Sequence, residues 1–198
     1  MVLHHSGTEP TWPAVISNQL TSILKQGGVA VLKTDTIYGL VGSALKPETV
    51  AKIYALKKRD PKKALIVLIA DQADLAQFGV VLSNWQDKWL SKHWPGPMSV
   101  ILTVSPWQVE NFSYLHAGTG KIAFRLPADP NLQALLKQTG PLVAPSANLE
   151  GEPPAETIEQ AKNYFGEQVD FYDDAGPCAG KASTLVDLTG EEEKILRA

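Results

Sequence analysis

Residues 56–70 read LKKRDPKKALIVLIA, and they join two segments of different character. The segment before them, residues 47–58, has the apolar spacing of a helix and carries Pro47 in the first turn, where proline is tolerated. Residues 64–70 are wholly apolar, which is typical of a short strand covered on both faces. We therefore expect a helix, a basic turn and a buried strand in this stretch.

Helices and strands alternate in the same way along the rest of the chain. Further helices are expected at residues 14–26, 131–138 and 156–165, with two more inside 71–93. Further strands are expected at residues 29–34, 99–104, 121–126, 141–145, 169–172 and 183–188. This interleaving predicts the α/β (α+β) class, and the mixture of short connections and long crossovers predicts a mixed sheet. No repeat or linker divides the chain, so a single domain is expected.

The composition excludes several classes of protein. Of the 198 residues, 44% are hydrophobic and 20% charged, with a formal net charge of −3, which is ordinary for a soluble globular protein. This charge argues against a protein whose whole surface coats nucleic acid. The single cysteine, Cys178, rules out an internal disulfide framework and a cysteine-rich metal site. No secretory signal or membrane-length apolar run is visible, so a cytoplasmic location is expected.

The basic turn places five cationic side chains within the seven residues 57–63. On the helix before it, Val50, Ile53 and Tyr54 mark the inward face, and Lys57 continues that stripe at position i+7. Lys58 points elsewhere. The turn is either a solvated connection or a clamp for a polyanion, in which arginine supplies a planar fork and lysine a point charge. The inward phase of Lys57 favours the clamp.

Other polar groups stand at the ends of predicted strands, where side chains commonly line a ligand crevice. They lie in KTDTIYGL (33–40), FRLP (124–127), APSANLEGEPP (144–154) and STLVDL (183–188). The chain contains neither the phosphate-binding P-loop pattern nor the dinucleotide glycine fingerprint. We find no nucleophile elbow and no metal-ligand spacing. Cations, hydroxyls and amides of this kind suit the binding of charged reactants better than a covalent enzyme intermediate.

In this order, KTDTIYGL, KKR, KKALIVLI, WPGP, FRLP, SAN, STLVDLTG and a terminal ILR resemble the YrdC-like family, the threonylcarbamoyl-AMP synthases of tRNA modification. The resemblance runs from about residue 10 to residue 197, so we expect the family domain at 10–198 and a flexible N-terminus at 1–9. It implies a twisted mixed sheet flanked by helices around a deep basic cavity. Because the chain stops just after Arg197, it resembles the short, single-domain bacterial type.

The resemblance also implies roles for individual residues. Lys57 and Arg59 would contact phosphates and carry the catalysis. The side chains implied to bind ATP are Lys57, Arg59, Lys63, Ser146, Asn148 and Arg197. Those implied to hold L-threonine are Thr36, Arg125 and Ser183. Weaker candidates are Thr34, Tyr38, Lys121, Ala144 and Thr184.

The implied reaction joins L-threonine, bicarbonate and ATP into threonylcarbamoyl-AMP and releases pyrophosphate, which makes the enzyme an L-threonylcarbamoyladenylate synthase, a nucleotidyltransferase. The product would pass to a separate transferase complex that modifies the adenosine beside the tRNA anticodon. Mg²⁺ would be held mainly by ATP oxygens and water, without an organic cofactor or a protein metal site. Positioning and neutralisation of phosphate charge would dominate the catalysis.

Two other functions remain open. A double-stranded RNA or tRNA-binding module without catalysis would use the same basic turn, although KTDTIYGL, SAN and Arg125 would then have no task. A carbamoyltransferase carrying a similar domain would be a much longer chain with metal-binding modules. Two departures from the family pattern are Ser99, where threonine is frequent, and Ala182, where proline is common. We expect both to affect structure more than chemistry.

Overall fold

The computed structural model describes residues 14–198, and the N-terminal segments 1–9 and 10–13 considered above lie outside this range. Nine strands of the described chain form one sheet in the order β7-β1-β2-β6-β3-β5-β4-β8-β9. The strands are β1 (Val29–Lys33), β2 (Tyr38–Ser43), β3 (Ile66–Leu68), β4 (Met98–Thr103), β5 (Lys121–Arg125), β6 (Leu142–Val143), β7 (Phe171–Tyr172), β8 (Thr184–Asp187) and β9 (Lys194–Arg197). The pairs β1–β7, β3–β5 and β4–β8 are parallel and the others antiparallel, so the predicted mixed sheet is confirmed.

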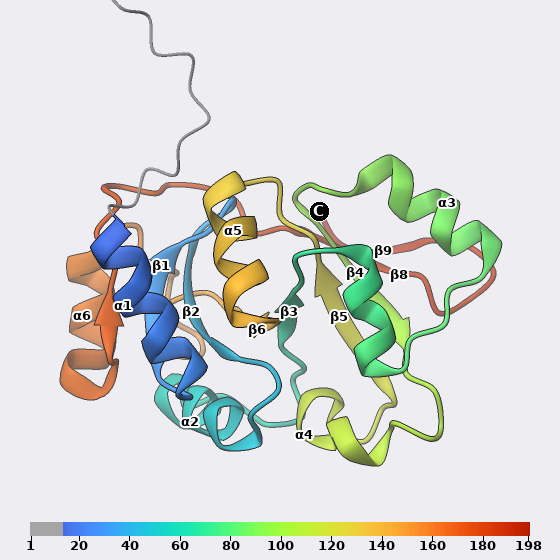
Figure 1. Cartoon of the computed structure of the whole chain (residues 1–198), viewed down its shortest axis with the longest axis horizontal. Helices are drawn as coiled ribbons and strands as arrows, with labels where there is room; N and C mark the ends of the chain where they lie inside the picture. The colour runs from blue at the N-terminus through green and yellow to red at the C-terminus, as the bar shows by residue number, and fades with distance from the viewer. Residues whose placement is uncertain (1–13) are drawn as a thin grey trace, which may run out of the picture.

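The helices surround this sheet (Figure 1). They are α1 (Ala14–Lys25), α2 (Pro47–Lys57), α3 (Asn84–His93), α4 (Ser113–His116), α5 (Pro130–Thr139) and α6 (Ile158–Phe165), with 3₁₀ turns η1 (Gln72–Phe78), η2 (Glu110–Phe112) and η3 (Gly166–Gln168). Of the two helices expected within residues 71–93, the first is the 3₁₀ turn η1 and the second is α3. None of the helices in residues 14–198 is both long and apolar enough to cross a membrane.

Two clusters of buried apolar side chains lie on opposite faces of the sheet. In β1, Ala30 and Leu32 belong to the cluster formed with α1 and α5, whereas Val29 and Val31 belong to the cluster that includes α2 and α6. Successive side chains of a strand point to opposite faces, so the alternation along β1 separates the two clusters. Figure 1 shows α1 and α5 covering the near side of β1 and β2. The sheet is thus covered on both sides, as the apolar strands predict.

The strand β2 was not expected from the sequence. Every residue of Tyr38–Ser43 is buried, so the alternation of polar and apolar residues that reveals a half-exposed strand is absent. Gly42 stands where α2 crosses the strand, and a Cβ there would lie 2.5 Å from Cγ2 of Thr49. The glycine therefore permits the close approach of helix and strand. β2 pairs with β1 from Lys33 opposite Tyr38, which turns residues 34–37 into a hairpin loop.

Candidate active site

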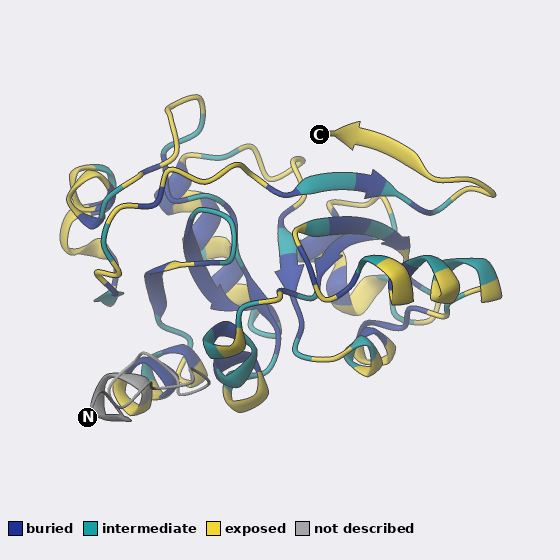
Figure 2. Ribbon diagram, turned by 90° about the horizontal axis from the view of Figure 1, so that it is seen from above, coloured by how far each residue is buried: buried dark blue, intermediate teal, exposed yellow. Residues whose placement is uncertain are grey.

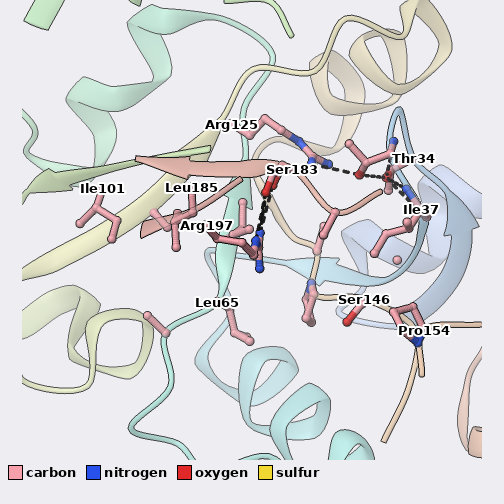
Figure 3. A pocket seen from close by; sticks show the side chains of 18 of the residues that line it. Thr34, Ile37, Leu65, Ile101, Arg125, Ser146, Pro154, Ser183, Leu185 and Arg197 are labelled. Atoms are coloured by element: carbon pink, nitrogen blue, oxygen red, sulfur yellow. Dashed lines mark hydrogen bonds between the residues drawn. The ribbon is translucent and has the colours of Figure 1, made fainter. Parts of the chain in front are cut away.

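A cavity of ≈ 490 Å³ opens on the surface of the central strands β3, β5, β4 and β8 and is bounded by the hairpin loop 34–37, the turn after α2, and the loop after β6 (Figure 3). Its charged lining side chains are the cations Arg59, Lys121, Arg125 and Arg197 and the carboxylate Asp187. The cavity is therefore positively charged. Figure 2 shows that β9, which carries Arg197, is exposed along its whole length.

Nine of the residues predicted from the sequence line this cavity: Thr34, Thr36, Arg59, Lys121, Arg125, Ala144, Ser146, Ser183 and Arg197. Five others lie outside its lining: Tyr38, Lys57, Lys63, Asn148 and Thr184. Segments remote in sequence thus converge on one space. Thr184 is excluded because it begins β8, where alternate side chains face opposite sides, and its neighbours Ser183 and Leu185 take the cavity side.

The hairpin loop 34–37 is braced by its own hydroxyls and by an ion pair. The Thr34 hydroxyl donates to the Ile37 carbonyl at 2.7 Å, and Nη1 of Arg125 donates to Oγ1 of Thr36 at 3.1 Å. Nη2 of Arg125 lies 3.0 Å from Oδ1 of Asp35, with both side chains more than nine-tenths buried. Burial raises the pKa of Asp35 and Arg125 opposes that rise. The partner that an arginine at the end of an apolar strand requires is therefore Asp35.

Ser183 connects two parts of the cavity wall. Its hydroxyl lies 2.8 Å from the hydroxyl of Ser99 on β4, and both residues are buried. Its carbonyl accepts hydrogen bonds from Nε of Arg197 at 3.1 Å and from Nη2 at 2.8 Å. Figure 3 shows the guanidinium of Arg197 directed at Ser183 inside the cavity. Ser99 thus orients a lining hydroxyl, a role that the sequence did not reveal.

Lys57 is buried, as the helical stripe predicted, but its ammonium group is occupied by protein oxygens. It donates to the Ser146 carbonyl at 2.5 Å, to the Asn148 carbonyl at 2.7 Å and to Oδ1 of Asn148 at 3.1 Å. Burial lowers the pKa of Lys57 to about 8, with Arg59 acting in the same direction and Glu150 against it. Lys57 therefore holds the loop after β6 in place and supports the cavity from behind.

The Ser-Ala-Asn loop is fixed by a dense set of hydrogen bonds. The Ser146 hydroxyl donates to Oδ1 of Asn148 at 2.6 Å, while Nδ2 of Asn148 donates to the carbonyls of Leu149 and Glu152 at 2.9 and 2.6 Å. The amide of Asn148 thus bonds within the loop at both ends, and its Oδ1 also accepts from Lys57 of α2. Only Ser146 reaches the cavity lining. The loop therefore presents a hydroxyl on a rigid backbone.

The basic turn divides its cations between the cavity and a carboxylate. Lys58 ends α2 in the left-handed conformation (φ 50°) and is exposed, which directs Arg59 back toward the cavity. Arg59 donates to the carbonyls of Lys63 and Ala64 at 3.1 and 3.2 Å. Lys63 instead pairs with Glu150, and the hydrogen bond from Lys63 lowers the pKa of that carboxyl. Only Arg59 of this turn lines the cavity in the present conformation.

A strap formed by residues 173–183 crosses the hairpin loop. Tyr38 fastens it, since its hydroxyl donates to the Gly176 carbonyl at 2.7 Å and accepts from the Ala175 amide at 3.2 Å. Gly180 lies against the loop so closely that a Cβ would stand 1.7 Å from the Thr36 carbonyl oxygen. Tyr38 is thus a buried anchor, and the strap brings Ala182 and Ser183 to the cavity.

Sequence reasoning missed Asp35, Ser99, Thr119 and Asp187, of which the last two line the cavity. Lys121 bridges toward Asp187: its ammonium donates to Oγ1 of Thr189 at 2.8 Å and lies 3.8 Å from Oδ2 of Asp187. Signals for some of these residues were present. Asp35 lies inside the quoted KTDTIYGL, and Asp187 lies four residues after Ser183 in STLVDL.

Comparisons with known proteins agree with this fold. The family model Sua5/YciO/YrdC, described as telomere recombination, matches residues 22–198. A protein of Idiomarina loihiensis named threonylcarbamoyl-AMP synthase is 34% identical over 164 residues, covering 81% of this chain and 83% of the relative. A protein of Mycobacterium tuberculosis named putative threonylcarbamoyl-AMP synthase is 31% identical over 175 residues, covering 88% and 79%.

Solved structures show the same arrangement. YciO of E. coli superposes with a TM-score of 0.83 at 25% identity, covering 95% of this chain and 91% of that one. Sua5 of P. abyssi complexed with L-threonine also gives 0.83, at 26% identity, but this chain spans only 53% of the Sua5 chain. The predicted twisted mixed sheet flanked by helices is thus confirmed. Since the family model covers nearly all of the described residues, the chain belongs to the Sua5/YciO/YrdC family.

Proposed function

We propose that this protein is a threonylcarbamoyl-AMP synthase that joins L-threonine, bicarbonate and ATP and releases pyrophosphate. The observation that carries the proposal is the contact between Arg197 and Ser183 inside one basic cavity. Arg197 is implied to bind ATP and Ser183 to bind threonine, so the two reactants would meet there. The relatives named threonylcarbamoyl-AMP synthase and the Sua5 structure with L-threonine support the same assignment.

The proposed chemistry makes few covalent demands on the protein. The amine of threonine attacks bicarbonate to give a carbamate with loss of water, and a carbamate oxygen then attacks the α-phosphorus. The bond from that phosphorus to the bridging oxygen of the β-phosphate breaks, and pyrophosphate leaves. Catalysis then consists of alignment and neutralisation of charge. Arg59 and Arg197 would act on phosphate and Ser146 would offer a hydroxyl, and all three line the cavity.

On the threonine side, Arg125 and Thr36 form one hydrogen-bonded unit and Ser183 a second group on the same cavity. A guanidinium suits the threonine carboxylate. Lys63 is paired with Glu150, so Lys63 would reach a phosphate only by leaving Glu150. Asp187 is the single carboxylate among the charged lining residues, and it accepts from the Thr189 hydroxyl. This donor set fits Mg²⁺ held by the phosphates and water, where it would neutralise phosphate charge.

The deciding experiment measures pyrophosphate release from ATP by the purified protein with bicarbonate, with and without L-threonine. We expect release that depends on threonine and on bicarbonate. If threonine gives no release and duplex RNA binds tightly instead, the cavity serves a polymer and the synthase assignment is wrong. Delivery of the product to a separate tRNA-modifying complex in the cytoplasm is part of the same proposal and would be tested by adding that complex and tRNA.

Ser99→Ala should weaken threonine binding. Without the Ser99 hydroxyl, the buried Ser183 hydroxyl loses its closer partner and keeps the 3.4 Å contact with Nη2 of Arg197, which costs about 1–3 kcal/mol. We expect the KM for threonine to rise roughly tenfold and the KM for ATP to change little. Ser99→Thr keeps a hydroxyl and should behave like the parent protein. Ser43→Ala, at a buried serine on β2 outside the cavity, is the matched control, and an equal effect there would contradict the assignment.

The contribution of Lys57 to stability should depend on pH. Its pKa is about 8 in the folded protein and ~10.4 in an unfolded chain. Between these values the unfolded chain binds more protons, so the free energy of unfolding gained from Lys57 rises with pH. Urea unfolding at pH 7, 8, 9 and 10 should show the difference between the parent and Lys57→Met shifting in favour of the parent. A difference that falls would mean that the three oxygen acceptors outweigh burial.

A further inference from the structure

His116 is a buried imidazole that lies outside the cavity and outside the proposed chemistry. It is the last residue of α4 and is 1% exposed. The four residues that follow it, Ala117–Gly120, form a tight loop that leads directly into β5. Lys121, the first residue of β5, and Thr119 in the loop both line the cavity. His116 is therefore one loop away from two residues that line the cavity.

The ring of His116 has partners on both nitrogens. Nε2 lies 2.7 Å from the carbonyl oxygen of Val109, which can only accept, so Nε2 carries the proton. Nδ1 is then the acceptor for two amide groups, the N–H of Gly118 at 3.1 Å and the N–H of Gly120 at 3.2 Å. A neutral ring in a single tautomer satisfies all three contacts. Both ring nitrogens of His116 thus take part in hydrogen bonds.

The loop Ala117–Gly120 depends on Nδ1 of His116 as an acceptor because its backbone adopts a conformation that is unfavourable in energy. Ala117, Gly118 and Gly120 have φ values of 50°, 82° and 66°, a conformation that costs energy for an alanine. The backbone carbonyl of His116 also accepts from the amide and the hydroxyl of Thr119, at 2.9 and 2.7 Å. Ring and carbonyl of one residue thereby collect four hydrogen bonds from residues 118–120. The path of the loop is set by His116.

The loop path determines where two lining side chains stand. The Thr119 hydroxyl accepts a hydrogen bond from the Lys121 amide at 3.2 Å. The Gly120 carbonyl accepts one from the Val104 amide at 2.8 Å, and this bond ties the loop to the segment after β4. Lys121 then extends along the wall to Thr189. If Gly118 and Gly120 lost their acceptor, Thr119 and Lys121 would shift together.

We propose that His116 is a positioning residue that shapes the loop Ala117–Gly120 so that Thr119 and Lys121 face the nucleotide, without touching it itself. The proposal rests on the proposed function of the cavity, because it assigns the ammonium group of Lys121 to the phosphates of ATP. It assigns the effect to one ring nitrogen, Nδ1. The Nε2 side serves only to anchor the ring to Val109.

Two substitutions separate the nitrogens. In His116→Asn the side-chain oxygen lies near the position of Nδ1 and can accept from Gly118 and Gly120. In His116→Gln the amide nitrogen lies near the position of Nε2 and can donate to Val109. We expect both variants to lower the melting temperature. His116→Asn should keep the KM for ATP within about threefold of the parent, whereas His116→Gln should raise it about tenfold or more, with the KM for threonine nearly unchanged.

Leu115→Ala is the control for stability, since Leu115 is a fully buried core residue of the same helix. It should lower the melting temperature without changing the KM for ATP. Equal effects of Asn and Gln on that KM, or an effect of Leu115→Ala as large as that of Gln, would overturn the positioning role. Calorimetric Kd values for ATP keep the two proposals apart. Absence of threonine-dependent pyrophosphate release in the parent would refute the synthase function. The ratio of the Kd values of His116→Asn and His116→Gln would still test the positioning role of His116.

Discussion

Asp35→Ala should lower the free energy of unfolding by about 3–5 kcal/mol, because it leaves the guanidinium of Arg125 buried without its ion-pair partner. Nε of Arg125 already has no hydrogen-bond partner among the described residues. Among residues 14–198, the hydrogen bond to the Thr36 hydroxyl would then be the remaining side-chain contact of the guanidinium. Equilibrium unfolding in urea measures the loss. Asp35→Asn keeps the shape and removes the charge, so its loss should be smaller.

A double variant separates folding from function at this pair. Asp35→Leu combined with Arg125→Met replaces the ion pair by apolar side chains, which is often neutral or stabilising at buried sites. We expect it to regain most of the stability that Asp35→Ala loses. It should show no threonine-dependent pyrophosphate release at threonine concentrations that saturate the parent. If the double variant is active, Arg125 does not hold the threonine carboxylate.

Lys57→Met should reduce kcat/KM by at least about 100-fold, the size of effect expected when catalytic groups move by about 1 Å. The change removes the donor for the Ser146 and Asn148 oxygens, so the loop that presents the Ser146 hydroxyl would shift. Stability should fall as well, because buried acceptors are left unpaired. Steady-state pyrophosphate release and urea unfolding give the two quantities.

Lys58→Ala is the matched control for Lys57→Met, because the two lysines are adjacent and Lys58 is exposed at the end of α2. We expect its kcat/KM to stay within about threefold of the parent, since a single exposed charge contributes little. Arg59→Ala, which removes a lining cation, should raise the KM for ATP with less effect on stability. Equal losses for all three would refute the directional reading of the helix.

The sequence predicted the helices and strands more completely than the contacts that their side chains make. Hydrophobic periodicity and composition identified most strands, because a buried strand leaves a recognisable apolar pattern within a few residues. They also gave the inward direction of Lys57, since helical phase extends to the last turn. What Lys57 meets there depends on a loop some ninety residues further on, and no local pattern encodes that meeting. Strand β2 was missed because full burial removes its alternation, while Gly39, Gly42 and Ser43 break the apolar run that reveals a buried strand.

The site was predicted to a similar depth. The resemblance located the lining residues Arg59, Arg125 and Ser146, whose assigned roles remain proposals. It did not reveal that Lys63 is paired with Glu150, since a pairing across loops depends on tertiary geometry. Ser99 was noticed only as a departure from the family pattern. Its contact with Ser183 requires β4 and β8 to be parallel neighbours, which the sheet order supplies.

The sheet order has a consequence for how this protein acquires its cavity. The hairpin loop with Thr34 comes from the start of the described chain, whereas Arg197 comes from β9, the last strand of the described chain and an edge of the sheet. Contacts between such distant segments form slowly, because the entropy cost of closing a long loop comes before the contacts can stabilise the fold. During synthesis the cavity therefore stays incomplete until β9 has paired with β8. A nascent chain would fold most of its core before its cavity had all the side chains that line it.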